Sequence, residues 1–167
     1  MKNIAKFFGI SIVATLLISG MGGVSACHEF SDLYAGQHTI VGEVEVLHAG
    51  GSSTVTITYR TDDGWEIKNT HLGVVKDFDD FPTTKKGNPK VGHLGREGLD
   101  GCRRPTTKTD TMVEYEVDIG AGYTGPLYIA AHAVVWHPCL GEETAWGNTG
   151  TSFPGNNWAL YFVVEIV

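Results

Sequence analysis

Two histidines on separate strand-like segments are the residues best suited to bind a metal. His71 shares one face of an extended segment with Trp65 and Ile67, because residues two apart in a strand point the same way. If the segment that carries His132 is its neighbour, the two rings meet close to Glu142 or Glu143. Imidazole nitrogens and a carboxylate are ligands for Zn²⁺ or Cu²⁺. One hypothesis is therefore a metal-binding protein or metal-dependent enzyme centred on these residues; the alternative is that both histidines are hydrogen-bonded core residues.

A glycine-rich segment, residues 141–157, combines aromatic, amide and acidic side chains in a pattern that suits sugar binding. A tryptophan ring offers a flat apolar face to a sugar, and amides and carboxylates bind its hydroxyl groups. We therefore expect a glycan or another cell-envelope component as the ligand, held between this segment and a basic loop. The expected ligand-binding residues are Trp146, Glu143, Phe153, Asn156, Lys86 and Lys90. The alternative is that Trp146 fills the end of the fold and pins its loop.

Other chemical motifs are weak or missing. Asp77, Asp79 and Asp80 carry oxygens that suit Ca²⁺, but Pro82 stands where an EF-hand loop would continue, and a solvated acidic turn is the alternative. The sequence has no G-x-S-x-G elbow, P-loop, G-x-G-x-x-G or H-E-x-x-H motif. No catalytic residue is therefore predicted, and a binding module is favoured over an enzyme. A structural or adhesive surface protein is a further alternative.

The N-terminus has the layout of a secretory signal peptide. A basic start with Lys2 and Lys6 precedes an apolar or small-residue run over 7–24, and Val-Ser-Ala then meets Cys27. A cysteine directly after small residues resembles the lipobox of bacterial lipoproteins. We expect residues 1–26 to be removed and Cys27 to carry a lipid that anchors the protein at the membrane or cell surface, with plain secretion as the alternative.

Two further cysteines remain in what is then an oxidising compartment. A disulfide between Cys102 and Cys139 is the default expectation there. It would tie the basic loop to the segment that carries Trp146. The alternative is two free, buried thiols.

Charge is distributed unevenly along the chain. Loss of Lys2 and Lys6 leaves ten basic residues against nineteen acidic ones, a net charge of −9 that argues against nucleic acid as a partner. Seven of these ten basic residues nevertheless lie between Lys85 and Lys108, and none follows Thr109. No second apolar run is long enough to span a bilayer, so the lipid is the expected membrane contact.

Alternation of apolar and polar residues predicts strands throughout the mature chain. It is clear over 40–46, 55–59, 65–75 and 113–119, while 127–136 and 158–167 are apolar at nearly every position and should be central strands. Residues 76–110 show no convincing strand and read as one long basic loop. We predict an all-β, two-sheet antiparallel sandwich, jelly-roll or immunoglobulin-like, over residues 34–167, after a short tether at 27–33.

Several strings resemble those of a family of secreted β-rich domains found in bacterial and archaeal surface proteins. They are Thr70-His71-Leu72, KGNPKVG (86–92), LYIAAHAVV (127–135), EETAWG (142–147) and FPGNNWALYF (153–162). The resemblance covers residues 34–166. It implies an exported β-rich domain, and it carries over no activity and no catalytic residue.

Overall fold

The computed structural model describes residues 26–167, so the predicted signal peptide lies outside the described residues except for Ala26. Within them the chain forms antiparallel strands, and the predicted all-β fold is confirmed. The strands are β1 (Cys27–Ala35), β2 (Thr39–His48), β3 (Thr54–Thr61), β4 (Glu66–Val75), β5 (Thr107–Lys108), β6 (Met112–Asp118), β7 (Gly125–His137), β8 (Gly141–Asn148), β9 (Thr151–Ser152) and β10 (Leu160–Ile166). Three short helices interrupt the long loop, and they are η1 (Phe78–Asp80), η2 (Val91–His93) and α1 (Leu94–Glu97).

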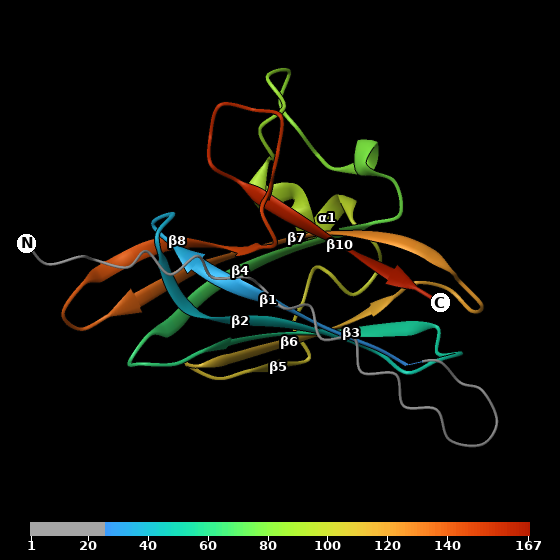
Figure 1. Cartoon of the computed structure of the whole chain (residues 1–167), viewed down its shortest axis with the longest axis horizontal. Coiled ribbons are helices and arrows are strands. Elements are labelled where there is room, and N and C mark those ends of the chain that lie inside the picture. Colours follow the sequence, from blue (N-terminus) through green and yellow to red (C-terminus); the bar gives the residue numbers. More distant parts are fainter. Residues whose placement is uncertain (1–25) are drawn as a thin grey trace, which may run out of the picture.

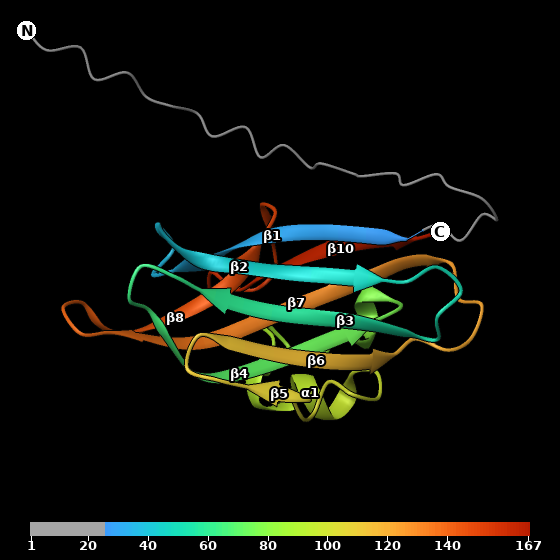
Figure 2. The ribbon, with the colours of Figure 1, turned by 90° about the horizontal axis from the view of Figure 1, so that it is seen from below.

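The strands form one hydrogen-bonded sheet that bends over on itself. Its order is β5-β6-β3-β2-β1-β8-β7-β10-β9, and β4 pairs with the other edge of β7. One layer holds β4, β7, β8 and β10, the facing layer holds β1, β2, β3, β5 and β6, and the pairing of β1 with β8 joins them (Figure 1 and Figure 2). The two predicted sheets are therefore the two halves of one continuous sheet.

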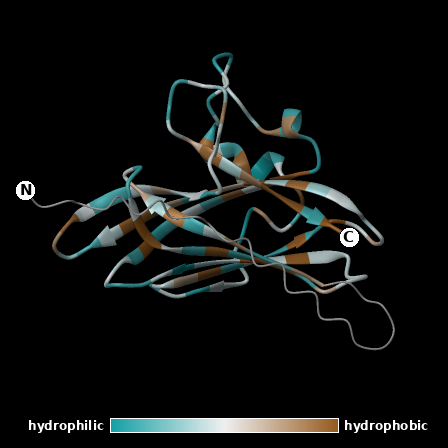
Figure 3. Cartoon of the chain, viewed as in Figure 1, coloured by the Kyte–Doolittle hydropathy of each residue, from teal (hydrophilic) through white to brown (hydrophobic). Residues whose placement is uncertain are grey.

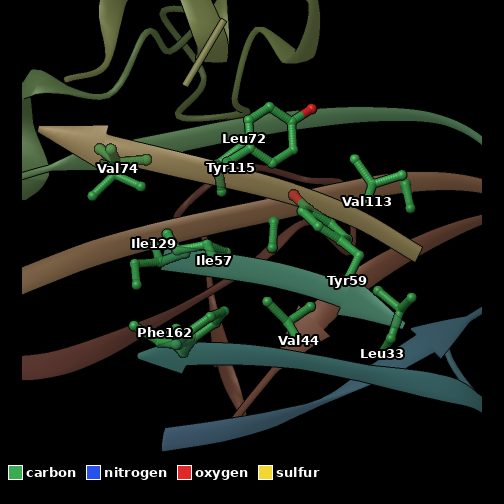
Figure 4. Packing of buried hydrophobic residues seen from close by; sticks show 14 of the residues in the cluster. Leu33, Val44, Ile57, Tyr59, Leu72, Val74, Val113, Tyr115, Ile129 and Phe162 are labelled. Atoms are coloured by element: carbon green, nitrogen blue, oxygen red, sulfur yellow. The ribbon is translucent and has the colours of Figure 1, made fainter. Parts of the chain in front are cut away.

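Apolar side chains from both layers fill the space between them. Leu33 and Ile57 from one layer belong to the same core cluster as Leu72 and Ile129 from the other, and all four are fully buried (Figure 4). The predicted alternation places them there, since every second residue of a strand faces the core. The strands in Figure 3 accordingly change between hydrophobic and hydrophilic colours along their length.

The layer that contains β7 is also covered on its outer face. Phe81 and Leu94 from the long loop, Trp146 from β8 and Phe153 from the last loop form a second buried cluster there. Gly73 of β4 permits this cover, because a Cβ at that position would stand 3.0 Å from Leu94 Cδ2. Because both faces of β7 are covered, the prediction that 127–136 is a central strand is correct. β10 differs, because Val163 is 44% exposed and only one face of its C-terminal half is covered.

A β-bulge in β4 changes which face its side chains occupy. The register with β7 shifts between Ile67 and Asn69, so one extra residue lies in β4. Trp65 and Ile67 belong to the inner core, whereas His71 lies on the opposite face beside His132. The prediction that His71 shares a face with Trp65 and Ile67 is therefore wrong, since it assumed an uninterrupted strand.

Two segments that were expected to be irregular are strands. Residues 27–33, predicted as a tether, belong to β1, which pairs with β2 from Cys27↔His48 onward. Residues 141–148, predicted as part of a loop, form β8. Ala145 and Gly147 are buried where β8 faces the core. The packing there is so close that only small residues fit, since a Cβ on Gly147 would stand 3.0 Å from Phe162 Cε1.

The predicted disulfide is not formed, and Cys102 and Cys139 are both free. The Cys102 thiol is hydrogen-bonded to the backbone of Val74 in β4, and Val74 pairs with Ile129 of β7. Cys139 follows His137, eight residues further along that strand, or about 26 Å away at the rise of a strand. Disulfide-bonded Cα atoms lie about 4.4–6.8 Å apart, so the two thiols cannot meet in this fold.

The long loop closes the side of the molecule where β4 and β6 do not pair. Leu99 N donates to Val74 O of β4 at 2.9 Å, and Asp118 N of β6 donates to Asp100 O at 2.8 Å. Gly101, with φ +101, follows immediately, and a Cβ there would stand 2.0 Å from Glu116 O. The loop is thus fixed between the two layers, and only glycine fits at its closest approach.

We expect Gly101→Ala to destabilise the protein by at least about 2 kcal/mol more than Gly122→Ala. Both glycines have positive φ, but a Cβ at Gly122 would meet no atom within 4 Å. The comparison therefore isolates the contact with β6 from backbone strain. Denaturant unfolding of the two variants measures the difference, and equal losses would contradict the described closure.

Candidate functional site

The turn that carries Lys86 lies against the loop that follows Phe153, as the sequence predicts, although no disulfide joins them. Asn157 N donates to Asn88 Oδ1 at 3.1 Å. A Cβ on Gly155 would stand 1.8 Å from the same oxygen, so glycine is required at this approach. Lys86 and Asn156 are exposed in these adjoining segments, and so is Lys90 after the turn.

The predicted sugar-stacking platform is absent because its aromatic rings are buried. Trp146 is 3% exposed and Phe153 2% exposed, and both belong to the cluster under the loops. Trp146 therefore packs in one cluster with the loop residues Phe81, Leu94 and Phe153 and holds these loops in place. This agrees with the alternative prediction, that Trp146 pins a loop. Glu143 is exposed opposite Val135 and next to Gly36, so it takes no part in that cluster. The six predicted ligand-binding residues do not form one site.

The two predicted histidines do meet. His71 and His132 are direct cross-strand partners of β4 and β7, and their Nδ1 atoms are 3.2 Å apart. His132 is buried at 7% exposure and stands edge-on to Trp146 with ring centroids 4.9 Å apart. The predicted alternative of hydrogen-bonded core residues holds for His132, whereas His71 is only partly buried.

The predicted third metal ligand is not near them. Glu142 pairs with Trp136, four residues from His132 along β7 and therefore about 13 Å away. Over residues 26–167 no three His, Cys, Asp or Glu side chains are grouped to hold a metal ion. Asp77 of the predicted calcium turn instead caps η1, where its Oδ1 accepts from Asp79 N at 3.0 Å.

A hollow of about 290 Å³ opens beside this histidine pair, along β4. The strand provides its floor, and the long loop provides two arginines and two glycines. Its lining residues are Asn69, Thr70, His71, Gly92, Gly95, Arg96, Cys102 and Arg103. None of them is acidic. The sequence indicated a basic loop but not this hollow, because the hollow depends on how the loop lies against β4.

Local packing of α1 shapes the hollow. Leu94 is fully buried over Gly73, which fixes the start of α1 on the sheet. A Cβ on Gly95 would stand 2.9 Å from Cys102 O, so the helix lies directly against the chain that returns to β6. Arg96, the next residue, is exposed at the rim together with Arg103.

The floor of the hollow is neutral at physiological pH. Burial raises the pKa of Cys102 to about 12, so its thiol stays protonated and is not a nucleophile. Thr70 Oγ1 and Tyr115 OH are hydrogen-bonded to each other at 2.7 Å across the two layers. Burial also lowers the pKa of His71, and the charges in the lining therefore come from the arginines.

A second hollow, of about 390 Å³, lies further along the same loop and differs in charge. It contains Lys76 together with the acids Asp80 and Glu97. Lys76 Nζ lies 4.3 Å from the centre of the Tyr123 ring, a cation–π contact. Its lining thus carries charges of both signs.

Comparison of the sequence with protein-family models found no match, and neither did comparison with curated proteins or with solved structures. No helix in the described part of the chain has the length and apolar character required to cross a membrane. The candidate site is therefore interpreted from its geometry alone.

We expect buried His132, which contacts His71, to make the fold sensitive to acid. Burial lowers the pKa of His132 to about 4, and the charge of neighbouring His71 contributes. An unfolded histidine titrates near pH 6.5, so the unfolded state binds a proton first as the pH falls. Stability should then decrease by on the order of 3 kcal/mol between about pH 6.5 and pH 4.

Denaturant unfolding at several pH values tests this expectation. His132→Asn, which cannot take up a proton, should lose much of the pH dependence in that range. His38→Asn is the control, because His38 is exposed in the turn between β1 and β2 and should keep the wild-type slope. Equal slopes in all three proteins would contradict the assignment.

Proposed function

We propose that this chain is an exported β-rich module that binds a glycan or another cell-envelope ligand without catalysis. The single observation that carries the proposal is the hollow beside β4, which has two exposed arginines and no acid in its lining. The lining thus differs in charge from the protein as a whole, and the one acid whose charge acts on Cys102, Asp100, does not line the hollow. The proposed binding surface is the hollow between the long loop and β4, and it does not include Trp146.

Binding is favoured over catalysis by the chemistry of the lining. Its one thiol is kept protonated by burial, and the remaining side chains are guanidinium, imidazole, amide and hydroxyl groups. Glycoside hydrolysis uses a pair of carboxyl groups, and this lining contains none. Amides and guanidinium groups are suited to hold a polar ligand in place.

Export through the N-terminal signal is part of the same proposal. The exported protein is either anchored by a lipid on Cys27 or secreted without a lipid. Cys27 begins β1 and is 8% exposed, so a lipidated Cys27 would require the end of this strand to open. Mass spectrometry of the mature protein distinguishes a Cys27 whose sulfur carries a diacylglyceryl group from an unmodified Cys27.

The binding proposal is tested by filling the hollow without changing its charge. A Cβ on Gly92 would meet no atom within 4 Å, so Gly92→Trp is expected to fold and to occupy the hollow. Calorimetry with glycans selected on an array should show at least about tenfold weaker binding for this variant. Leu47→Trp is the control, because Leu47 is 43% exposed on β2 in the other layer.

Two outcomes would contradict the proposal. Unchanged affinity in Gly92→Trp would place the ligand elsewhere on the protein. An absence of binding by the wild-type protein to any glycan or envelope extract would favour the structural or adhesive role instead.

A second candidate function is transition-metal binding at His71 and His132. The specific observation is the separation of 3.2 Å between their Nδ1 atoms. Two nitrogens bound to one tetrahedral Zn²⁺ at about 2.0–2.1 Å lie about 3.3 Å apart, so a single ion fits between them after small movements. Solvent or a ligand group in the hollow would complete the coordination.

Calorimetric titration with Zn²⁺ and with Cu²⁺ tests this candidate. It is best done in a Cys139→Ser background, because Cys139 is an exposed thiol that can bind either metal by itself. One equivalent should bind, and His71→Ala should abolish binding while His38→Ala keeps it. Retention of the metal in His71→Ala would exclude the pair as the site.

A further inference from the structure

We propose that the hollow beside His71 is an oxyanion site, and that the ligand is an acidic glycan whose carboxylate, phosphate or sulfate group lies between Arg96 and Arg103. This inference rests on the proposed function and specifies the chemistry of its ligand. It concerns the same hollow, but it predicts a charge requirement that glycan binding alone does not.

The two arginines have no ion-pair partner within residues 26–167. Two cations of the longer strands are engaged instead. Arg60 contacts Glu45 at 3.4 Å, and Lys68 is paired with Glu66. Within residues 26–167 the cations without an ion-pair partner therefore all lie between Lys76 and Lys108, and two of them line one hollow.

The nearest carboxylate on the same helix does not compensate this charge. Glu97 Oε1 is 2.8 Å from His93 Nδ1, so its oxygen is already in contact with another side chain. Glu97 lines the second hollow, whereas Arg96 lines the hollow beside His71. The guanidinium of Arg96 keeps its donors available for a ligand.

Guanidinium groups are particularly suited to oxyanions. Each presents five N–H donors in a planar fork that matches two oxygens of a carboxylate, phosphate or sulfate. Neutral donors adjoin them on the floor. Asn69 Oδ1 accepts from Thr70 N at 2.9 Å, which leaves the Asn69 amide group free to donate to a sugar hydroxyl.

A third cation, Lys108, lies outside the lining but contacts the strand next to Asn69. Lys108 Nζ donates to Lys68 O at 3.3 Å, immediately before Asn69 in β4. The positive charge thus continues from α1 along the edge of the strand. An anion at the arginines would experience attraction from this side as well.

The size of the hollow limits the ligand. At about 290 Å³ it lies just below the range for small-molecule sites, which is about 300–1,000 Å³. A single charged sugar unit therefore matches it better than several units or a large lipid. The rest of a polysaccharide would extend over the exposed loop surface.

The test uses the mature protein and four probes, namely oligogalacturonate, a sulfated dextran oligosaccharide, neutral dextran and inorganic sulfate. Calorimetry should show binding of both acidic oligosaccharides and no binding of neutral dextran. Arg96→Ala and Arg103→Ala should each weaken binding about tenfold, and the double variant about a hundredfold. Lys85→Ala, which removes an exposed cation outside the lining, should change the affinity by less than about twofold.

A matched pair of variants at Gly92 separates charge from fold. Gly92→Asp and Gly92→Asn place nearly the same shape in open space within the lining, but only the aspartate repels an anion. The aspartate variant should bind at least about tenfold more weakly than the asparagine variant. Raising the salt from about 50 to about 200 mM should weaken binding by the wild-type protein and less so by the double arginine variant.

The outcomes distinguish this inference from the function on which it rests. Glycan binding that survives the double arginine substitution, or equal affinities in the two Gly92 variants, would overturn the oxyanion site while the glycan proposal stands. Inorganic sulfate that binds as tightly as the oligosaccharides, with the same loss in the arginine variants, would support the oxyanion site and overturn the glycan as its source.

Discussion

The open side of the folded sheet is the constraint on which the rest of the structure depends. β4 and β6 do not pair with each other there, β5 covers only Val113 and Glu114 of β6, and the remaining strand edges need a cover. The long loop supplies it through backbone hydrogen bonds to Val74 and Asp118, with Gly101 against Glu116. Because this return path is fixed, Arg103 and Cys102 come to lie beside β4. The hollow is therefore a consequence of how the fold is closed.

The outer face of β4, β7 and β8 imposes a second requirement. It is apolar, and Trp146, Phe153 and Leu94 bury it together with the loops that carry or cover them. The bulge in β4 turns His71 towards this face, where the closed loops place it at the edge of the hollow. The histidine pair and the arginines are thus neighbours although they come from different parts of the sequence.

Alternation in the sequence predicted the strands well where one face is apolar, as in β2, β3 and β6. It missed β8, because Thr144 and Ala145 lack the branched apolar pattern and the strand is buried through small residues. It also could not show the bulge at Ile67–Asn69, which depends on pairing. The number of cysteines suggested a disulfide, but that number does not tell how far apart Cys102 and Cys139 lie in the folded chain. The basic loop was visible in the sequence, whereas the lining of a hollow was not, since it results from contacts between distant segments.

The charge pattern gives this architecture its functional meaning. An acidic protein repels anions in general, and one hollow with uncommitted guanidinium groups makes a local exception. The most direct measurement is an amide chemical-shift map of the mature protein titrated with oligogalacturonate. We predict the largest shifts at residues 69–71, 92–96 and 102–103, which line the hollow or adjoin its lining. Largest shifts on β2 and β3, in the other layer, would contradict the account.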